Sequence, residues 1–159
     1  MSFTKHDLLV IGYGNTLRSD DGVGPRVAEA IEALQLPGVH TMVCQQLWPE
    51  YAEPISQARR VIFVDAAVDT PAEVQFRKLT PNDSVQLMAH AADPRTMLAF
   101  SRDVFGHAPE AWWLTIGGVE FGFGESFSTQ TEAGFHEAFC MIKSLAENNC
   151  QVADLNWKT

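Results

Sequence analysis

The chain has 159 residues, of which 46% are apolar and 19% are charged, and its formal net charge is -9. This length and composition allow one domain, residues 1–159, to bury a core of its own, which excludes an intrinsically disordered protein. The negative charge would repel a phosphate backbone and no stretch gathers lysine and arginine, so nucleic acid is excluded as a partner.

Short apolar runs along the chain predict the strands. Four of them are rich in valine, isoleucine, phenylalanine and tryptophan and are bounded by glycine, proline or charge, as is typical of strands buried on both faces. They lie at 8–13, 39–45, 61–66 and 112–117. A fifth run, 74–79, alternates between apolar and polar residues and predicts an edge strand.

Helical patterns separate these runs. The apolar residues that follow Asp21 have helical spacing, and Pro37 ends the pattern. A second helix should begin near Pro49, where proline suits the first turn, and Pro54 should shorten or kink it.

The third helix has the clearest boundaries. Asp93 is a good N-cap, Pro94 suits the first helical position and Gly106 suits the C-terminal end. A last helix is predicted over 131–148. Because strands and helices alternate, the sequence predicts an α/β fold with a mainly parallel twisted sheet and helices on both faces, whose ligands gather at the carboxyl ends of the strands.

The cysteines and the hydropathy pattern indicate the compartment. Cys44, Cys140 and Cys150 are odd in number and far apart, which favours reduced thiols in the cytoplasm over a disulfide framework. No apolar run approaches the ~20 residues that a membrane span needs, so no membrane insertion is expected. The tail, 151–159, is short and polar, and we expect it to be loosely ordered.

Several familiar site motifs are absent from the sequence. It contains no P-loop, no GxSxG elbow and no HExxH zinc helix. The Gly12-Tyr13-Gly14 turn begins like a dinucleotide-binding fingerprint, but Leu17 stands where the third glycine belongs. A nucleotide cofactor is therefore not favoured.

Acidic residues follow two of the predicted strands. Asp20 and Asp21 come after the first strand, Asp65 ends the most apolar one, and His90 lies in the loop before the third helix. In a parallel sheet these places share one edge, so we expect two carboxylates and an imidazole to converge there. Such a set suits a borderline divalent metal such as nickel or zinc and leaves positions open for a substrate.

Each of these residues also has a structural alternative: Asp65 could cap a following turn, and His90 could be an ordinary loop histidine. Asp20 or Asp21 could cap the helix that follows, although both cannot be the same cap. His107 competes with His90, but its place after Gly106 favours a contact with backbone carbonyls. Trp112 and Trp113 are expected to pack on the sheet, as their place in a strand indicates.

Three stretches together resemble the nickel-iron hydrogenase maturation proteases. They are GYGNTLRSDDGVGPRVAEAI, VIFVDAAVD and MAHAADPRTMLAF, and the resemblance runs from Leu8 to about Leu145. These endopeptidases remove a C-terminal extension from the hydrogenase large subunit after nickel has been inserted. The resemblance implies a five-stranded sheet, and it places the family's nickel-contacting residues on Asp21, Asp65 and His90.

The resemblance also implies how the site is used. Nickel would belong to the precursor of the large subunit and would be contacted transiently, so no tightly bound cofactor is expected. Many members have Glu where this chain has Asp21, so either the backbone lies closer to the metal here or the metal geometry shifts slightly. Asp21 or Asp65 would accept a proton from the attacking water, and neither is singled out as the base.

Two other functions stay open at this point. The same residues could hold a resident zinc in a self-sufficient metallohydrolase. Alternatively, the chain could be a noncatalytic chaperone that binds the metallated large subunit without cutting it. The oligomeric state does not follow from the sequence.

Overall fold

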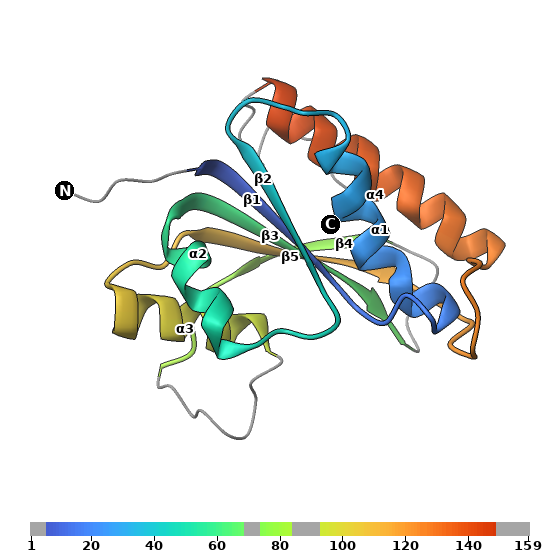
Figure 1. The fold of residues 1–159 in the computed structure, drawn as a ribbon, viewed down its shortest axis with the longest axis horizontal. Coiled ribbons are helices and arrows are strands. Elements are labelled where there is room, and N and C mark those ends of the chain that lie inside the picture. Colours follow the sequence, from blue (N-terminus) through green and yellow to red (C-terminus); the bar gives the residue numbers. More distant parts are fainter. Residues whose placement is uncertain (1–5, 69–73, 84–92, 149–159) are drawn as a thin grey trace.

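A five-stranded sheet with helices on both faces forms the centre of the molecule (Figure 1). The computed structural model describes residues 6–68, 74–83 and 93–148. The strands are β1 (His6–Tyr13), β2 (Val39–Cys44), β3 (Ala58–Ala67), β4 (Val74–Leu79) and β5 (Glu110–Gly117), in the spatial order β2-β1-β3-β5-β4. Only β4 runs antiparallel to its neighbour. The mainly parallel α/β fold and the edge position of 74–79 are confirmed.

The helices form two layers. Helices α1 (Val23–Glu32) and α4 (Thr129–Asn148) cover one face of the sheet, while α2 (Ala52–Ser56) and α3 (Pro94–Phe105) cover the other (Figure 1). Two short 3-10 helices, η1 (Ser19–Gly22) and η2 (Pro49–Tyr51), precede α1 and α2. Among the described helices, none has the combination of length and apolar character that crossing a membrane requires.

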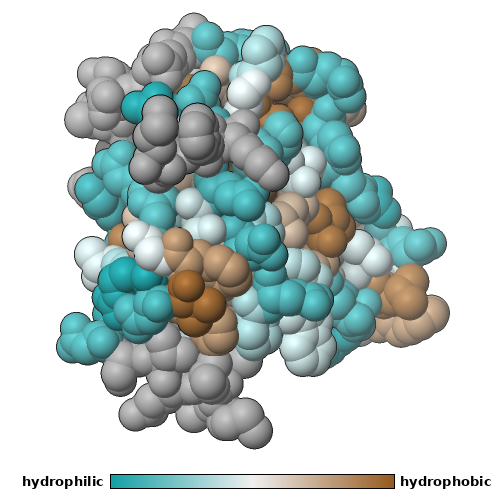
Figure 2. All heavy atoms as spheres, turned by 60° about the vertical axis from the view of Figure 1, so that its left-hand side comes forward, coloured by the Kyte–Doolittle hydropathy of each residue, from teal (hydrophilic) through white to brown (hydrophobic). Residues whose placement is uncertain are grey.

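The central strands β1, β3 and β5 are buried on both faces, which explains the long apolar runs in them. On β1, Leu8 and Val10 face α1 and α4, whereas Leu9, Ile11 and Tyr13 face α2 and α3. The outer surface is different. The side of the molecule shown in Figure 2 is mostly hydrophilic, with small apolar groups separated by polar side chains.

The predicted helix boundaries are largely confirmed. Asp93 caps α3, since its Oδ1 accepts a hydrogen bond from the Arg95 amide at 2.8 Å. Gly106 ends that helix in the left-handed conformation, with φ 82°. The second helix is only five residues long, which agrees with the shortening expected from Pro54.

The start of α1 lies directly against the sheet. A Cβ on Gly24 would come 2.4 Å from the carbonyl oxygen of Val64, near the end of β3. Gly24 therefore provides the close approach of helix to strand that Leu17 cannot provide in the fingerprint position. As a result, the turn between β1 and α1 is held beside the carboxyl end of β3.

Candidate active site

The turn after β1 places Asp21 at the carboxyl edge of the sheet. Asn15 organises this turn. Its side-chain Oδ1 accepts a hydrogen bond from the backbone amide of Leu17 at 2.9 Å, and its backbone amide donates to Oδ2 of Asp21 at 2.7 Å. Gly14 has φ 146°, and a Cβ there would lie 2.0 Å from the carbonyl oxygen of Asp21. The Gly-Asn pair of the motif thus fixes one oxygen of the Asp21 carboxylate, and no described residue donates to the other.

Asp20 has a structural role, although it is adjacent to Asp21. It is fully buried, and its carboxylate accepts hydrogen bonds from the backbone amides of Val119, Glu120 and Ser128 at 2.8 to 2.9 Å and from the Ser128 hydroxyl at 2.8 Å. Burial alone would raise the pKa of Asp20, but these hydrogen bonds outweigh it and hold the pKa below its ordinary value. Asp20 therefore anchors the segment after β5.

Helix capping explains neither of the two neighbouring acids. The residue that caps η1 is Arg18 and the one that caps α1 is Gly22, and neither makes a side-chain cap. The helix-capping alternative raised for Asp20 and Asp21 is therefore wrong for both residues. Asp20 accepts from a distant segment instead, while Asp21 is held within its own turn.

Asp65 lies near the end of β3, half-buried, on the sheet face that α2 and α3 cover. Burial raises its pKa to about 7. The amide of Ala66 opposes this shift, while the nearby charge of Asp21 adds to it and Tyr13 works against it. The structure therefore brings the two carboxyl groups of Asp21 and Asp65 within electrostatic reach of each other.

The third predicted site residue, His90, lies outside the described residues. Asp93, three residues further along the chain, caps α3, and its charge contributes to raising the pKa of Tyr13 in β1. In the described part of the chain, no group of three or more histidine, cysteine or acidic side chains could hold a metal ion. Asp21 and Asp65 present carboxylate oxygens, a ligand type that divalent ions accept.

His107, the competing histidine, lies away from this edge. Its Nε2 is 3.2 Å from the carbonyl oxygen of Ala58, the first residue of β3. The ring contacts a backbone carbonyl, but this carbonyl belongs to the amino end of β3 and not to the end of α3, where a helix cap was expected. His107 therefore takes no part in a site at the carboxyl ends.

Two aromatic residues beside Asp65 were not predicted as part of the site. Tyr13 ends β1 and Trp113 lies in β5, and both face α2 and α3, as Asp65 does. Trp112 packs on the opposite face, where it stacks against Phe76 with ring centroids 6.0 Å apart. The expected packing role is confirmed for both residues, since Trp113 packs against the core on its own face of the sheet, and Trp113 also reaches Tyr13. The alternation of side chains along β1 and β5 was the available signal.

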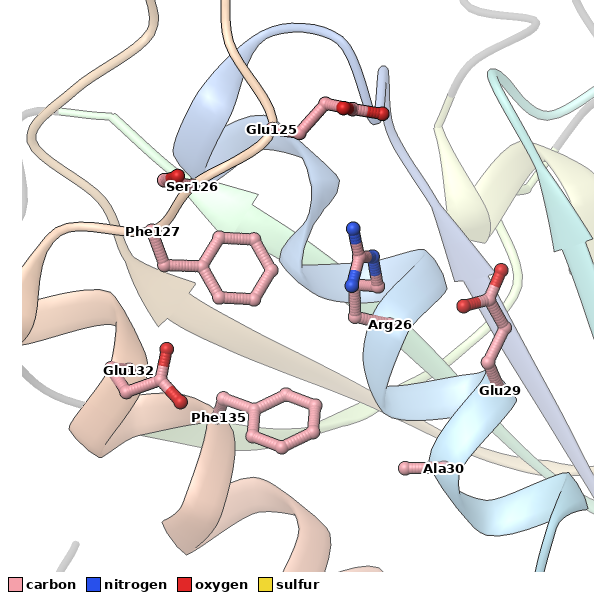
Figure 3. Close-up of a pocket in the computed structure, with 8 residues that line it drawn as sticks. All are labelled: Arg26, Glu29, Ala30, Glu125, Ser126, Phe127, Glu132 and Phe135. Atoms are coloured by element: carbon pink, nitrogen blue, oxygen red, sulfur yellow. The ribbon is translucent and has the colours of Figure 1, made fainter.

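A hollow of about 640 Å³ lies on the other face of the molecule, between α1, α4 and the segment before α4 (Figure 3). Its walls include the aromatic rings of Phe127 and Phe135 and the carboxylates of Glu29 and Glu132. Arg26 occupies part of it, with its guanidinium carbon 5.9 Å from the centroid of the Phe127 ring. Neither Asp21 nor Asp65 lines this hollow.

Comparisons by sequence give no relative: no protein-family model matches the chain, and no curated protein matches it. Comparison by structure finds proteins with the same fold. Hydrogenase maturating endopeptidase HybD from E. coli superposes with a TM-score of 0.70 at 20% sequence identity, over 89% of this chain and 93% of that chain.

Two archaeal structures agree with this result. The [NiFe] hydrogenase maturation protease HycI from Thermococcus kodakarensis KOD1 gives a TM-score of 0.72 at 21% identity, over 91% of this chain and 94% of that chain. Hydrogenase 2 maturation peptidase from Thaumarchaeota archaeon SCGC_AB-539-E09 gives a TM-score of 0.65 at 20% identity, over 89% of this chain and 98% of that chain. Across most of its length, this chain has the fold of the hydrogenase maturation proteases.

Proposed function

We propose that this chain is an endopeptidase that removes the C-terminal extension from the large-subunit precursor of a nickel-iron hydrogenase after nickel insertion. The observation that carries the proposal is the pairing of Asp21 and Asp65 at the carboxyl edge of a sheet with this fold. The names of the structural neighbours support the hydrolase chemistry and the hydrogenase precursor as the partner.

Nickel enters this proposal as part of the substrate. Asp21 and Asp65, with His90 as a third ligand, would contact the ion in the precursor. Two nearby carboxylates repel each other without a cation between them, which is one source of the raised pKa of Asp65. A precursor that brings the ion relieves this repulsion, whereas an unmetallated precursor does not. Nickel thereby becomes the feature that selects the substrate.

Hydrolysis requires a group that moves protons near neutral pH. Water attacks the carbonyl carbon of the scissile bond, its proton passes to a base, and the bond to nitrogen breaks as the leaving amine takes up a proton. In the free chain the pKa of Asp65 is about 7, chiefly because of burial, so this carboxyl group can both accept and donate a proton near neutral pH. Asp65 is therefore the member of the pair suited to this role.

The surface around the pair suits a protein substrate. Six large apolar side chains are exposed in or directly after the carboxyl ends of the four parallel strands: Leu17, Val43, Trp48, Val68, Val119 and Phe123. Phe123 is 92% exposed. A small-molecule site would enclose its apolar groups, whereas exposed ones spread over several loops provide a docking surface for a larger partner.

The test is a processing assay with purified precursor, loaded with nickel or without it, read by mass spectrometry. We expect loss of a C-terminal peptide from the nickel-loaded precursor alone. Asp21→Asn, Asp65→Asn and His90→Gln should each slow processing by about 100-fold or more, as the loss of a proton-transferring or ion-contacting group does. The control is Asp7→Asn, because Asp7 is an exposed acid at the amino end of β1, away from the proposed site.

The contrary outcomes identify the other functions. Stable binding of the nickel-loaded precursor with no change in its mass would indicate a chaperone and refute the protease proposal. A stoichiometric, tightly held zinc ion in the purified chain would indicate a metallohydrolase. Full activity in all three site variants would exclude the proposed residues.

A further inference from the structure

Two buried polar groups beside Asp65 lack a hydrogen-bond partner. The Tyr13 side chain is only 7% exposed, and neither its hydroxyl nor the indole Nε1 of Trp113 meets a partner at hydrogen-bonding geometry among the described residues. An unpaired buried donor destabilises a fold, so native proteins contain few of them. Two such donors beside one acid of the candidate site point to a function.

The register of the sheet explains why these groups meet. Gly12 pairs with Val64, so Tyr13 comes next to Asp65 on the neighbouring strand. Trp113 pairs with Phe63, two residues before Asp65 on the same face of β3. The three side chains therefore converge from β1, β3 and β5, the central strands of the sheet.

The electrostatic coupling of these groups agrees with this placement. Burial raises the pKa of Tyr13 well above its ordinary value, and the neighbouring Asp65 carboxyl raises it further. Trp113 acts in the opposite direction, as an N–H directed toward the phenol oxygen does. Tyr13 therefore keeps its proton and is available as a hydrogen-bond donor.

The chemistry of the three groups allows one direction for a row of hydrogen bonds. An indole N–H can only donate and an ionised carboxylate can only accept. The hydroxyl between them satisfies both when it accepts from Trp113 and donates to Asp65. A small adjustment of the side chains closes this row, because all three already lie side by side.

We propose that Tyr13 is a positioning residue for Asp65: its hydroxyl holds one carboxylate oxygen and leaves the other to face the substrate, while Trp113 sets the direction of the hydroxyl. The inference rests on the proposed function for the reaction that Asp65 performs. The hydrogen bond itself is a property of this chain alone, so it can be measured without a precursor.

The test compares Tyr13→Phe with Tyr51→Phe, which changes the only other tyrosine of the chain. Tyr51 packs against the same core, but its hydroxyl interacts with the Cys44 thiol. In Tyr13→Phe, carboxyl carbon NMR should show a higher pKa for Asp65, since a donor to its charged form is gone. At saturating nickel-loaded precursor, the processing rate should fall by about tenfold to 100-fold, the effect of one hydrogen bond to a charged group, with unchanged affinity for the precursor.

Thermal unfolding serves as the check on folding, and a single cooperative transition in Tyr13→Phe shows that this variant has folded. Tyr51→Phe should leave both the Asp65 titration and the rate unchanged. An unchanged Asp65 titration in Tyr13→Phe, or a full processing rate, overturns the proposal. If the wild type itself does not process the precursor, the proposed function fails, and the titration alone decides whether Tyr13 holds Asp65.

Discussion

The three acids of the candidate site region differ in how many hydrogen-bond donors each meets. The carboxylate of Asp20 accepts from three amides and a hydroxyl, whereas that of Asp21 accepts from one amide. Asp65 is buried with few donors, and burial dominates its pKa. A carboxylate saturated by donors is inert, while a poorly solvated one next to another acid binds protons or cations readily. This difference separates Asp20, which has a structural role, from Asp21 and Asp65, the proposed site pair.

The raised pKa of Asp65 gives a prediction about stability. The folded chain binds a proton at Asp65 up to about pH 7, whereas the ordinary pKa of an aspartate is 3.8, so the folded state holds more protons between these values. The free energy of unfolding should therefore fall as pH rises from about 4 to about 7, at up to about 1.4 kcal/mol per pH unit from this group. Urea denaturation at pH 5 and at pH 7 measures this change in the free energy of unfolding.

Asp65→Asn should remove most of this difference and should be more stable than the wild type at pH 7 by about 1 to 3 kcal/mol. Asp7→Asn serves as the matched control, because it removes an exposed carboxyl from the same chain. An equal loss of stability from pH 5 to pH 7 in wild type and Asp65→Asn would show that Asp65 does not hold its proton in the folded state.

At the scale of the elements, the site depends on how the connections between strands are held. The turn after β1 and the segment between β5 and α4 are joined through Asp20 and through two backbone hydrogen bonds of Gly124, which accepts from the Ser19 amide and donates to the carbonyl oxygen of Leu17. Ser19 adds a hydrogen bond from its hydroxyl to the carbonyl oxygen of Gly122 at 2.8 Å. The loop that carries Asp21 is thus supported by a segment about one hundred residues away.

We expect Asp20→Asn to loosen this support. An asparagine offers one acceptor oxygen where the carboxylate offers two, and its amide group faces N–H donors, so the free energy of unfolding should fall by about 2 to 4 kcal/mol. Hydrogen exchange should lose protection at the amides of Val119, Glu120 and Ser128. The wild-type contribution is present above about pH 4 and is lost on acidification, because the pKa of Asp20 lies below its ordinary 3.8. Unaltered protection of these amides would contradict the anchoring role.

The elements could be predicted from the sequence because each strand and helix has a local signal. The apolar run that ends at Asp65, the cap at Asp93 and the stop at Gly106 are read from neighbouring residues, and the parallel order places Asp21 and Asp65 at one edge. The partners of Asp20 could not be predicted, since they lie in a loop without periodicity about one hundred residues away. Tyr13 could not be predicted as a site residue, because its place beside Asp65 depends on the register between neighbouring strands.

For the molecule as a whole, the apolar and acidic features are distributed unevenly. Exposed apolar side chains gather around the carboxyl ends of the parallel strands, where Asp21 and Asp65 also lie. Phe105, at the end of α3, is exposed near the opposite edge. The net charge of -9 favours a partner with basic or metal-centred contacts.

This distribution predicts a docking defect in Phe123→Ser. The side chain is 92% exposed, so its replacement should change the free energy of unfolding by less than about 0.5 kcal/mol. Loss of a central aromatic contact should weaken binding of the nickel-loaded precursor by about tenfold or more. Binding is measured by titration with the Asp65→Asn variant, which prevents turnover. Phe105→Ser is the control, and equal effects of the two substitutions would show that binding does not use the carboxyl edge.

The tether at Asp20 has a consequence for newly synthesised protein. Its hydrogen bonds join residues up to 108 positions apart, so the turn that carries Asp21 gains its support only after the ribosome has released the segment before α4. A nascent chain that already contains both acids should therefore be inactive until its last quarter has emerged. The turn that carries Asp21 is therefore completed late in synthesis, after the part of the chain that contains both acids has been made.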